Sequence, residues 1–365
     1  ISGPVLLVAL KRFTTASGAT LAFGLYYTLL NLGFAAGGWI FDYFRGTYGD
    51  YSLVANLPVA GEVSIYQLLI AIALILTLPQ ILVISLMRDN IEMTESGIRL
   101  LKNKARDVKP LFSEMGRKIS EATKETSKLL YLVSRERRFW IFISALAIVT
   151  FIRIVSLHFL LTFPTYGIRL FGDGAQVGNL YAVLNPIVIV FLTPLFSVLT
   201  SRASSYSMLL LGCSVSALSI WIATAPPELL LPLMDTSFSL IVFDRWLDIP
   251  RVSWDPFYLS LVMFIFFFSV GEAIWAPRLM QFTAEIAPPE KEGSYIALSY
   301  LPLFLGQFLA GPMSGILLAT YLPSGSVEGY PFHYMVWVWI GLIGLLTPVG
   351  MIIFRKNFKR AENEI

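Results

Sequence analysis

The residues of this sequence that could do chemistry are three ionisable side chains inside long apolar runs. Arg153 and His158 lie in one run, and Glu272 lies in another. Charged groups within a lipid bilayer are costly and usually functional. Because a low-dielectric cavity disfavours the ionised carboxyl, Glu272 could hold a proton near neutral pH and release it when a cation approaches. The sequence therefore predicts a site for a proton or an ammonium group at Glu272; the alternative is a structural carboxylate paired with arginine or a backbone donor.

Other polar side chains in the apolar runs could assist Glu272. Arg153 is its natural counter-charge, because the two lie at similar depths when counted inward at about 1.5 Å per residue; a bound solute could bridge them instead. Histidine titrates near neutral pH, so His158 could relay protons, and the alternative is an interfacial histidine bonded to backbone. We interpret Arg278 as a gate or interface charge. The amides that could bind a solute or a neighbouring helix are Asn31, Asn185 and Gln307.

The composition is that of a membrane protein. Hydrophobic residues make up 56% of the chain and charged residues 14%, whereas soluble domains carry about 25% charged residues. Runs of about twenty residues with almost no charge can cross a bilayer as helices, and they lack the alternation of barrel strands. One cysteine, Cys213, and two histidines, His158 and His333, allow no intrachain disulfide and offer too few ligands for a metal or haem site. We expect no cofactor.

Eight apolar runs can be placed as membrane-spanning helices. They lie at 15–42, 64–87, 139–170, 175–200, 206–226, 257–284, 293–321 and 333–355. Residues 1–10 are interpreted as the last turns of an earlier span. Since the chain opens with Ile1 rather than Met, we expect it to be a fragment that lacks an N-terminal portion. The expected division is 1–87 for the end of a first helix bundle, 88–138 for a linker and 139–365 for a six-helix second bundle.

Basic residues are distributed unevenly between alternate loops. Of the 27 lysines and arginines, twenty-one lie on one side of the predicted helices, four on the other, and two within helices. The positive side is cytoplasmic, which predicts a multi-pass protein of the plasma or inner membrane with its linker and C-terminus inside. Within the linker, apolar residues at helical spacing predict an amphipathic helix on the cytoplasmic face; the alternative is a solvated tether. These residues are Val108, Phe112, Met115, Ile119 and Ala122.

Glycines recur at intervals of about four residues in two of the predicted helices. Small residues at such intervals let helix backbones approach closely in lipid. Because the two helices are six spans apart, the pattern fits a transporter built from two related halves. The glycines are Gly33, Gly37 and Gly38 in the first helix, and Gly306, Gly311 and Gly315 in the seventh.

Three motifs resemble those of the major facilitator superfamily and, within it, the proton-dependent oligopeptide transporters. They are Tyr26-Tyr27-Thr28-Leu29-Leu30-Asn31-Leu32-Gly33, then Leu184-Asn185-Pro186 followed by Thr193-Pro194-Leu195, and then Gly271-Glu272, Ala276-Pro277 and Ala287-Pro288. The resemblance covers most of residues 20–350. It implies an all-α membrane fold of twelve helices in two bundles around a central cavity. Eight helices would be present here, the last two of the N-terminal bundle and the six of the C-terminal bundle.

The resemblance also implies roles for individual residues. In such transporters the positions that match Asn31, Asn185 and Glu272 line the peptide site, and the glutamate is associated with the amino terminus of the substrate. The sequence departs from the family at two places. Its third predicted span has Arg153 and no acid where the family usually has one, and an arginine after Ala276-Pro277 is not typical.

The function expected from the sequence is secondary active transport of a small organic solute by alternating access, coupled to protons, with a peptide or amino-acid-like substrate favoured. Glu272 would bind the proton and an ammonium group, Asn31 and Asn185 polar backbone, and Arg153 a carboxylate. The alternative is a drug or metabolite exporter of the same superfamily. The alternative class is a polytopic membrane enzyme or a non-transporting sensor, although no enzyme motif is visible. The expected partners are the solute, protons and the lipid bilayer, with no nucleic acid, and we expect a monomer.

Overall fold

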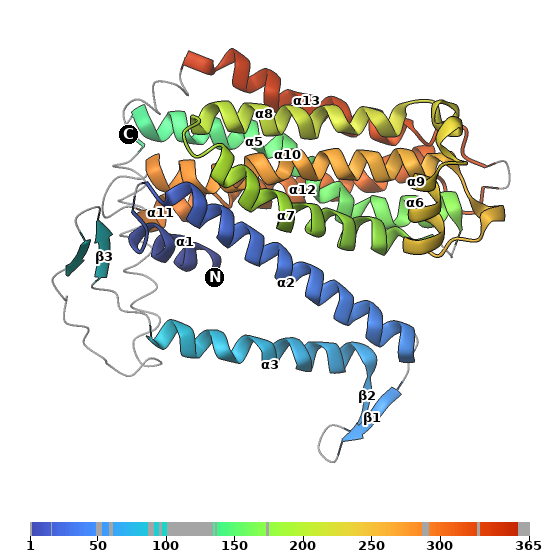
Figure 1. The fold of residues 1–365 in the computed structure, drawn as a ribbon, viewed down its shortest axis with the longest axis horizontal. Helices are drawn as coiled ribbons and strands as arrows, with labels where there is room; N and C mark the ends of the chain where they lie inside the picture. The colour runs from blue at the N-terminus through green and yellow to red at the C-terminus, as the bar shows by residue number, and fades with distance from the viewer. Residues whose placement is uncertain are drawn as a thin grey trace.

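The structure, a computed structural model, consists mainly of long helices (Figure 1). It describes residues 2–15, 17–48, 53–57, 61–86, 91–94, 97–100, 134–135, 137–172, 175–286, 292–326 and 329–356. The linker helix predicted around residues 108–122 lies outside the described residues.

The helices follow the order of the predicted spans. The α-helices are α1 Ser2–Arg12, α2 Ala19–Tyr48, α3 Ile65–Leu86, α5 Arg137–Leu161, α6 Phe163–Phe171, α7 Asn185–Leu199, α8 Ser205–Ser219, α9 Ser237–Ser239, α10 Pro256–Ile286, α11 Glu292–Leu298, α12 Leu301–Tyr321 and α13 Met335–Ile353. The 3₁₀ and π segments are η1 Asn179–Leu184, η2 Ile220–Thr224, η3 Pro227–Leu233, η4 Leu240–Trp246 and η5 Arg251–Ser253. Two antiparallel hairpins, which the sequence analysis did not predict, pair β1 Leu53–Leu57 with β2 Gly61–Ser64 and β3 Ile91–Thr94 with β4 Gly97–Leu100.

Seven segments of the described chain are long and apolar enough to cross a membrane. They are Ala19–Gly37, Phe139–Leu161, Asn179–Leu199, Ser205–Thr224, Pro256–Ile286, Tyr295–Tyr321 and Met335–Ile353. These match seven of the eight predicted spans. The remaining predicted span is α3, whose apolar part, Gln67–Val83, is shorter in the described residues. The prediction of an all-α membrane fold is confirmed.

Two predicted spans are each divided into two helices. The helix predicted over 139–170 breaks at Thr162 between α5 and α6, and the helix predicted over 293–321 breaks at Tyr300 between α11 and α12. In each case a proline stands two residues after the break. Proline has no N–H to donate and clashes with the preceding turn, so it favours the first turn of a new helix, although other prolines of this chain lie inside helices. The continuous helices predicted at these two places were wrong for that reason.

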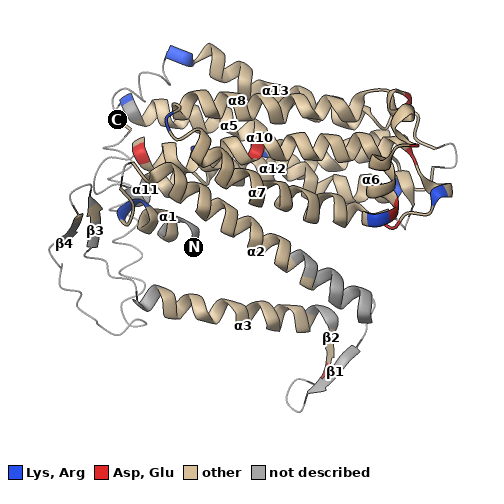
Figure 2. Ribbon diagram, in the orientation of Figure 1, with Lys and Arg blue, Asp and Glu red and all other residues tan. Residues whose placement is uncertain are grey.

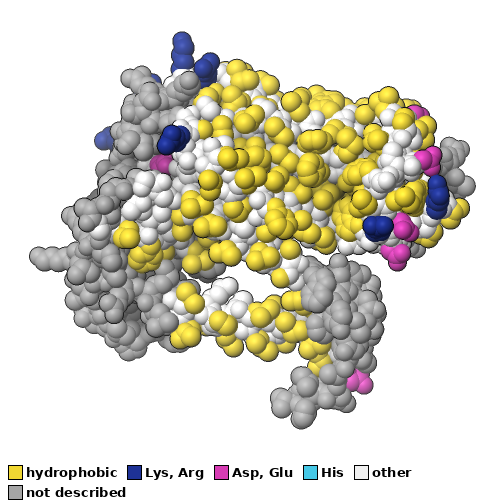
Figure 3. Space-filling model, viewed as in Figure 1, with side chains coloured by type: hydrophobic (Ala, Val, Ile, Leu, Met, Phe, Trp, Pro, Cys, Tyr) yellow, Lys and Arg dark blue, Asp and Glu magenta, His cyan; other side chains and the backbone are white. Residues whose placement is uncertain are grey.

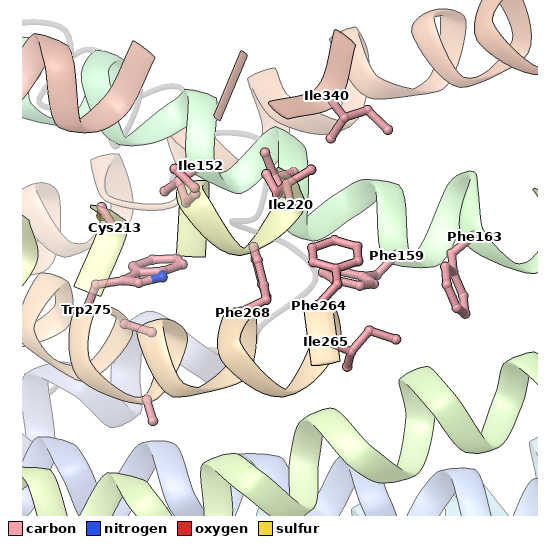
Figure 4. Packing of buried hydrophobic residues seen from close by; sticks show 14 of the residues in the cluster. Ile152, Phe159, Phe163, Cys213, Ile220, Phe264, Ile265, Phe268, Trp275 and Ile340 are labelled. Atoms are coloured by element: carbon pink, nitrogen blue, oxygen red, sulfur yellow. The ribbon is translucent and has the colours of Figure 1, made fainter. Parts of the chain in front are cut away.

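The bundle is organised around α10. This helix packs against α8, α7 and α2, while α5 packs against α12 and α13. Figure 4 shows apolar side chains from these helices meeting in the interior, among them Trp275, Phe268 and Ile152. At the closest point the α8 and α10 backbones nearly touch, since a Cβ added to Gly271 would lie 2.5 Å from the carbonyl oxygen of Gly212. The two glycines therefore set the spacing of the most intimate helix pair.

The surface divides into an apolar band and two polar ends. Lysine, arginine, aspartate and glutamate gather near the two ends of the long helices (Figure 2). One end carries α1 and α11, and the other carries α6 and α9 (Figure 1); they are called the α11 end and the α9 end below. Between them the visible face is covered largely by hydrophobic side chains (Figure 3). This pattern is that of a protein whose sides face lipid.

The glycine stripes behave differently from expectation. A Cβ added to Gly306 would lie 2.9 Å from Leu157 of α5, which is the close approach predicted. In the described part of the chain, Gly33, Gly37, Gly311 and Gly315 have no atom within 4 Å of such a Cβ. For these four glycines the described residues supply no close-packed helix, so the prediction is not tested there.

Substituting Gly271→Ala should destabilise the protein, because the new methyl would lie 2.3 Å from the Ser216 hydroxyl and 2.5 Å from the Gly212 carbonyl. We expect a loss of about 1–3 kcal/mol, the usual cost of overpacking. Gly311→Ala is the matched control in open space, and it should be neutral or stabilising because alanine favours helix over glycine by up to about 1 kcal/mol. Thermal unfolding in detergent measures both, and equal effects would contradict the α8–α10 contact.

Candidate functional site

The centre of the candidate site is a buried carboxylate held by two neighbouring helices. Glu272 of α10 is 8% exposed. Its Oε1 accepts a hydrogen bond from the Tyr27 hydroxyl of α2 at 2.9 Å, and its Oε2 accepts one from the Asn185 amide of α7 at 3.0 Å. The same amide nitrogen donates to Ser269 Oγ at 2.8 Å, one turn earlier on α10. Glu272 is thus the point where α2, α7 and α10 are joined by polar side chains.

The local sequence explains why Asn185 reaches this point. Asn185 begins α7, directly after the π segment η1, and is followed by Pro186. Proline removes a backbone donor and disfavours a regular α-helical turn before it, and π segments frequently occur at functional sites. The wider turn relieves the clash and places the asparagine amide against α10.

Asn31 lies beside the site rather than in it. Its amide donates to the backbone carbonyl of Tyr27 at 2.9 Å, within the same helix. Asn31 is 5% exposed, and this bond uses one of the two N–H groups of its amide. In this conformation Asn31 stabilises the turn of α2 that carries Tyr27 and does not bond to Glu272.

Arg153 reaches the site through an aromatic ring. The Arg153 guanidinium of α5 lies over the indole of Trp275, 4.7 Å from its centroid, and Trp275 follows Glu272 by three residues on α10. Among the described residues no ion pair within 4.0 Å joins Arg153 to Glu272. The direct pair that the sequence left open is therefore not formed here. The negative face of an indole attracts a cation through the ring quadrupole. A cationic solute could therefore compete with the Arg153 guanidinium for the face of Trp275.

The remaining predicted residues lie elsewhere. Gln307 is on an exposed face of α12. His158 is fully buried, and its imidazole contacts Thr162 rather than the Glu272 group. The sequence analysis missed Tyr27 and Trp275 as site residues. Helical spacing could have identified both residues. Tyr27 precedes Asn31 by four residues and Trp275 follows Glu272 by three, so each pair lies on one face of its helix.

A second polar network lies towards the α11 end of α10. Arg278 is 3% exposed. Its Nη1 donates to Thr20 Oγ1 of α2 at 3.0 Å and to Gln281 Oε1 at 3.1 Å. Its Nη2 donates to the backbone carbonyl of Thr200, just after α7, and to the Thr200 hydroxyl at 2.9 Å. The Gln281 amide donates in turn to Glu285 Oε1 at 2.7 Å. Arg278 therefore bonds to the same three-helix junction as Glu272, nearer one end.

The contact between α2 and α7 beside Arg278, called the seam below, is tight. A Cβ on Gly24 would lie 2.0 Å from Ser197 Oγ, so only glycine fits there. A small pocket beside Arg278 is lined in part by the hydroxyl side chains of Thr20, Ser197 and Thr200. The interface between the end of the first predicted bundle and the second is thus closed by a glycine contact and by the hydrogen bonds of one buried arginine.

Substituting Thr20→Val should loosen this seam. The change keeps the shape of the side chain and removes the oxygen that accepts from Arg278 and donates to Gln281 at 3.0 Å. Leaving buried polar groups without this partner costs about 1–3 kcal/mol, and we expect a lower unfolding temperature. The control Thr28→Val, in the same helix, removes a hydroxyl that donates to the Gly24 carbonyl of its own helix and should cost less. If Thr28→Val is the more damaging of the two, the proposed tie across the seam is refuted.

Comparison with known proteins gives one relationship and no family assignment. No protein-family model matches the chain. Over 234 residues the chain is 26% identical to "Multidrug resistance protein MdtH" of Yersinia enterocolitica serotype O:8 / biotype 1B, a match covering 64% of this chain and 49% of that protein. The match thus spans about half the length of this curated relative. Nothing in the comparison points specifically to oligopeptide transporters. With its apolar spans, the chain is an integral multi-pass membrane protein whose all-α fold is similar to that of the major facilitator superfamily.

Proposed function

We propose that this protein is a secondary active transporter of a small organic solute, working by alternating access and driven by protons bound at Glu272. The observation that carries the proposal is the buried carboxylate bonded to Tyr27 of α2 and Asn185 of α7. Intramembrane acids are rare and usually mark ion or substrate pathways. The similarity to a multidrug resistance protein supports the same class of function.

The hydrogen bonds suggest how a proton at Glu272 would act on the fold. Both carboxylate oxygens now serve as acceptors, one for Tyr27 and one for Asn185. An ionised carboxylate only accepts hydrogen bonds, whereas a protonated one must also donate. Protonation therefore weakens the acceptor at the oxygen that takes the proton. If that oxygen is Oε1, the bond from Tyr27 is weakened, so the proton state would bias this contact between α2 and α10.

The surroundings of Glu272 favour a solute with a cationic amine. The carboxylate can receive an ammonium group, and the rings of Tyr27 and Trp275 can receive its apolar part. Arg153, now over Trp275, could bind a carboxylate at the other pole of an amino-acid-like or peptide solute. A lipophilic cation would use Glu272 and the rings alone. Multidrug export is therefore the second candidate, and the relative's name favours it.

The charge distribution supports an orientation for the carrier. Lys11 and Arg12 end α1, and Arg355 and Lys356 follow α13, all near the α11 end. Basic residues at helix ends mark the cytoplasmic side. We therefore propose that the α11 end is cytoplasmic. On that orientation, the Arg278 network closes the cytoplasmic side in this conformation.

Substituting Glu272→Gln should sharply lower accumulation driven by a pH gradient, because an amide cannot cycle a proton, while solute exchange without a gradient persists. Proteoliposomes with an imposed pH gradient and a labelled amine provide the measurement. Glu228→Gln, the same chemical change at an exposed position of η3, is the matched control and should transport normally. A Glu272→Gln variant that accumulates the solute as well as the unsubstituted protein would show that the proton role of Glu272 is wrong.

Substituting Arg153→Gln should separate the two classes of solute. Uptake of a dipeptide should fall by about tenfold or more, the loss of one charge-assisted hydrogen bond of about 1.5–3 kcal/mol. Transport of a lipophilic cation without a carboxylate should be unchanged or faster, because a competing positive charge is removed. Arg153→Lys retains the charge and serves as the control. Equal losses for both solutes would indicate that Arg153 is structural.

A further inference from the structure

A second buried ionisable group lies away from Glu272, at the joint between α5 and α6. His158 is fully buried, and its Nδ1 lies 2.5 Å from Thr162 Oγ1. The Thr162 hydroxyl donates to Ser314 Oγ of α12 at 2.9 Å, and the Ser314 hydroxyl donates to the carbonyl of Leu161 at 3.2 Å. The other ring nitrogen of His158, Nε2, has no hydrogen-bond partner in the described part of the chain.

This chain of bonds determines which ring nitrogen carries the proton. A carbonyl can only accept, so the Ser314 hydrogen points to Leu161 and the Ser314 oxygen must accept from Thr162. The single Thr162 hydrogen is thereby used, and its oxygen can only accept from His158. Nδ1 is therefore the protonated nitrogen and Nε2 carries a free lone pair. An acceptor buried without a partner is rare in proteins and calls for an explanation.

We propose that His158 is a second proton-binding site of the carrier, separate from Glu272, and that it takes up its proton at Nε2. The proposal rests on the transport function proposed above. The chain of hydrogen bonds ends on a backbone carbonyl, which cannot transfer a proton further. The chain is therefore not a proton-transfer path, and a proton can reach or leave the imidazole only through Nε2. Each hydroxyl in the chain points its oxygen towards the ring. Such aligned dipoles favour a positive charge on the imidazole, and hydrogen bonds in a chain reinforce one another.

The charged groups around the imidazole are engaged elsewhere. Neither α12 nor α13, both packed on α5, contains an acidic or basic residue within its bounds. From α6, the Tyr166 hydroxyl lies 2.7 Å from His333 Nδ1, and Arg169 donates to the Leu322 carbonyl at 2.6 Å. On α10, Glu272 is bonded to α2 and α7, and on α5 itself Arg153 lies over an indole ring.

No acid therefore compensates an imidazolium in this conformation, and burial disfavours the charge. The histidine is neutral here. A conformer that admits water to Nε2 removes the desolvation cost while keeping the bond to Thr162, so proton occupancy follows the opening of the α9 end. A coupling site must lack its proton while it is shielded from water and bind the proton when the protein opens, and His158 would do both.

The two histidines of the chain make the tautomer directly measurable. Solid-state NMR of ¹⁵N-histidine-labelled His333→Gln protein in lipid vesicles would leave His158 as the sole signal. We expect a neutral Nδ1–H imidazole at pH 8, converting in part to imidazolium at pH 5 in vesicles where the carrier cycles with solute. An Nε2–H tautomer, or an imidazole that stays neutral at pH 5, overturns the proposal. Thr162→Val removes the acceptor for Nδ1–H and should weaken the preference for that tautomer.

Transport provides an independent readout. Each coupled proton contributes about a tenfold factor in steady-state accumulation per pH unit, since one pH unit corresponds to about 1.36 kcal/mol. His158→Gln should lower accumulation by about that factor at a one-unit gradient and leave one proton coupled at Glu272. Unchanged accumulation overturns the proposal. A failure of the Glu272 mechanism would appear separately, as a Glu272→Gln carrier that accumulates the solute as well as the unsubstituted protein. The NMR result on His158 depends on neither transport variant.

The signal of the other histidine can be recognised in the unsubstituted protein. His333 lies outside the spans, before α13, and is half-buried. Burial lowers the pKa of His333, although nearby Asp255 opposes the shift. The pKa of His333 is therefore expected below its ordinary value, whereas protonation of His158 should depend on the solute-driven cycle. A comparison of the spectra with and without solute distinguishes the two rings.

Discussion

The structure depends on the need to hydrogen-bond the polar groups that lie within the bilayer. No water is available there, so a polar side chain must find its partner in another part of the protein. Glu272 meets this requirement with one bond to α2 and one to α7. Arg278 meets it with hydroxyl and carbonyl groups of the same junction. The polar groups that would be costly in isolation are therefore also the links that hold α2, α7 and α10 together.

The apolar contacts complement these links. Without a hydrophobic driving force between helices in lipid, close packing of small residues does much of the work. Gly212 and Gly271 bring α8 and α10 nearly to backbone contact, which fixes α10 against the second bundle. On another face α10 presents Glu272 to α2 and α7. Because close packing against α8 holds one face of α10, this helix can stay in place while the hydrogen bonds of Glu272 on its other face form or break.

The sequence predicted the membrane spans, which depend on the composition of each segment. It did not predict contacts, such as that of Tyr27, which depend on a partner elsewhere in the chain. Runs without charge predicted seven of the spans because burial in lipid is decided by each segment alone. The breaks at Thr162 and Tyr300 were missed because a helix-spanning window averages over the proline that causes each break. Glu272 was found from its isolation in an apolar run. Tyr27 was not, because an aromatic residue in a span is ordinary until a carboxylate from a helix 245 residues away is known to accept its hydrogen.

Glu272 and His158, two of the buried ionisable groups, bond to different sets of helices. Glu272 joins α2, α7 and α10, whereas His158 with its hydroxyl chain joins α5, α6 and α12. The sets share no helix, yet they meet where Arg153 of α5 lies over Trp275 of α10. A change at Glu272 that shifts Trp275 would therefore move α5, the helix that carries His158. On the proposed mechanism, proton binding at either group would reach the other through this one contact, without a bond between them. In an alternating-access cycle this arrangement would let the central carboxylate and the outer imidazole exchange their protonated states as the molecule opens and closes.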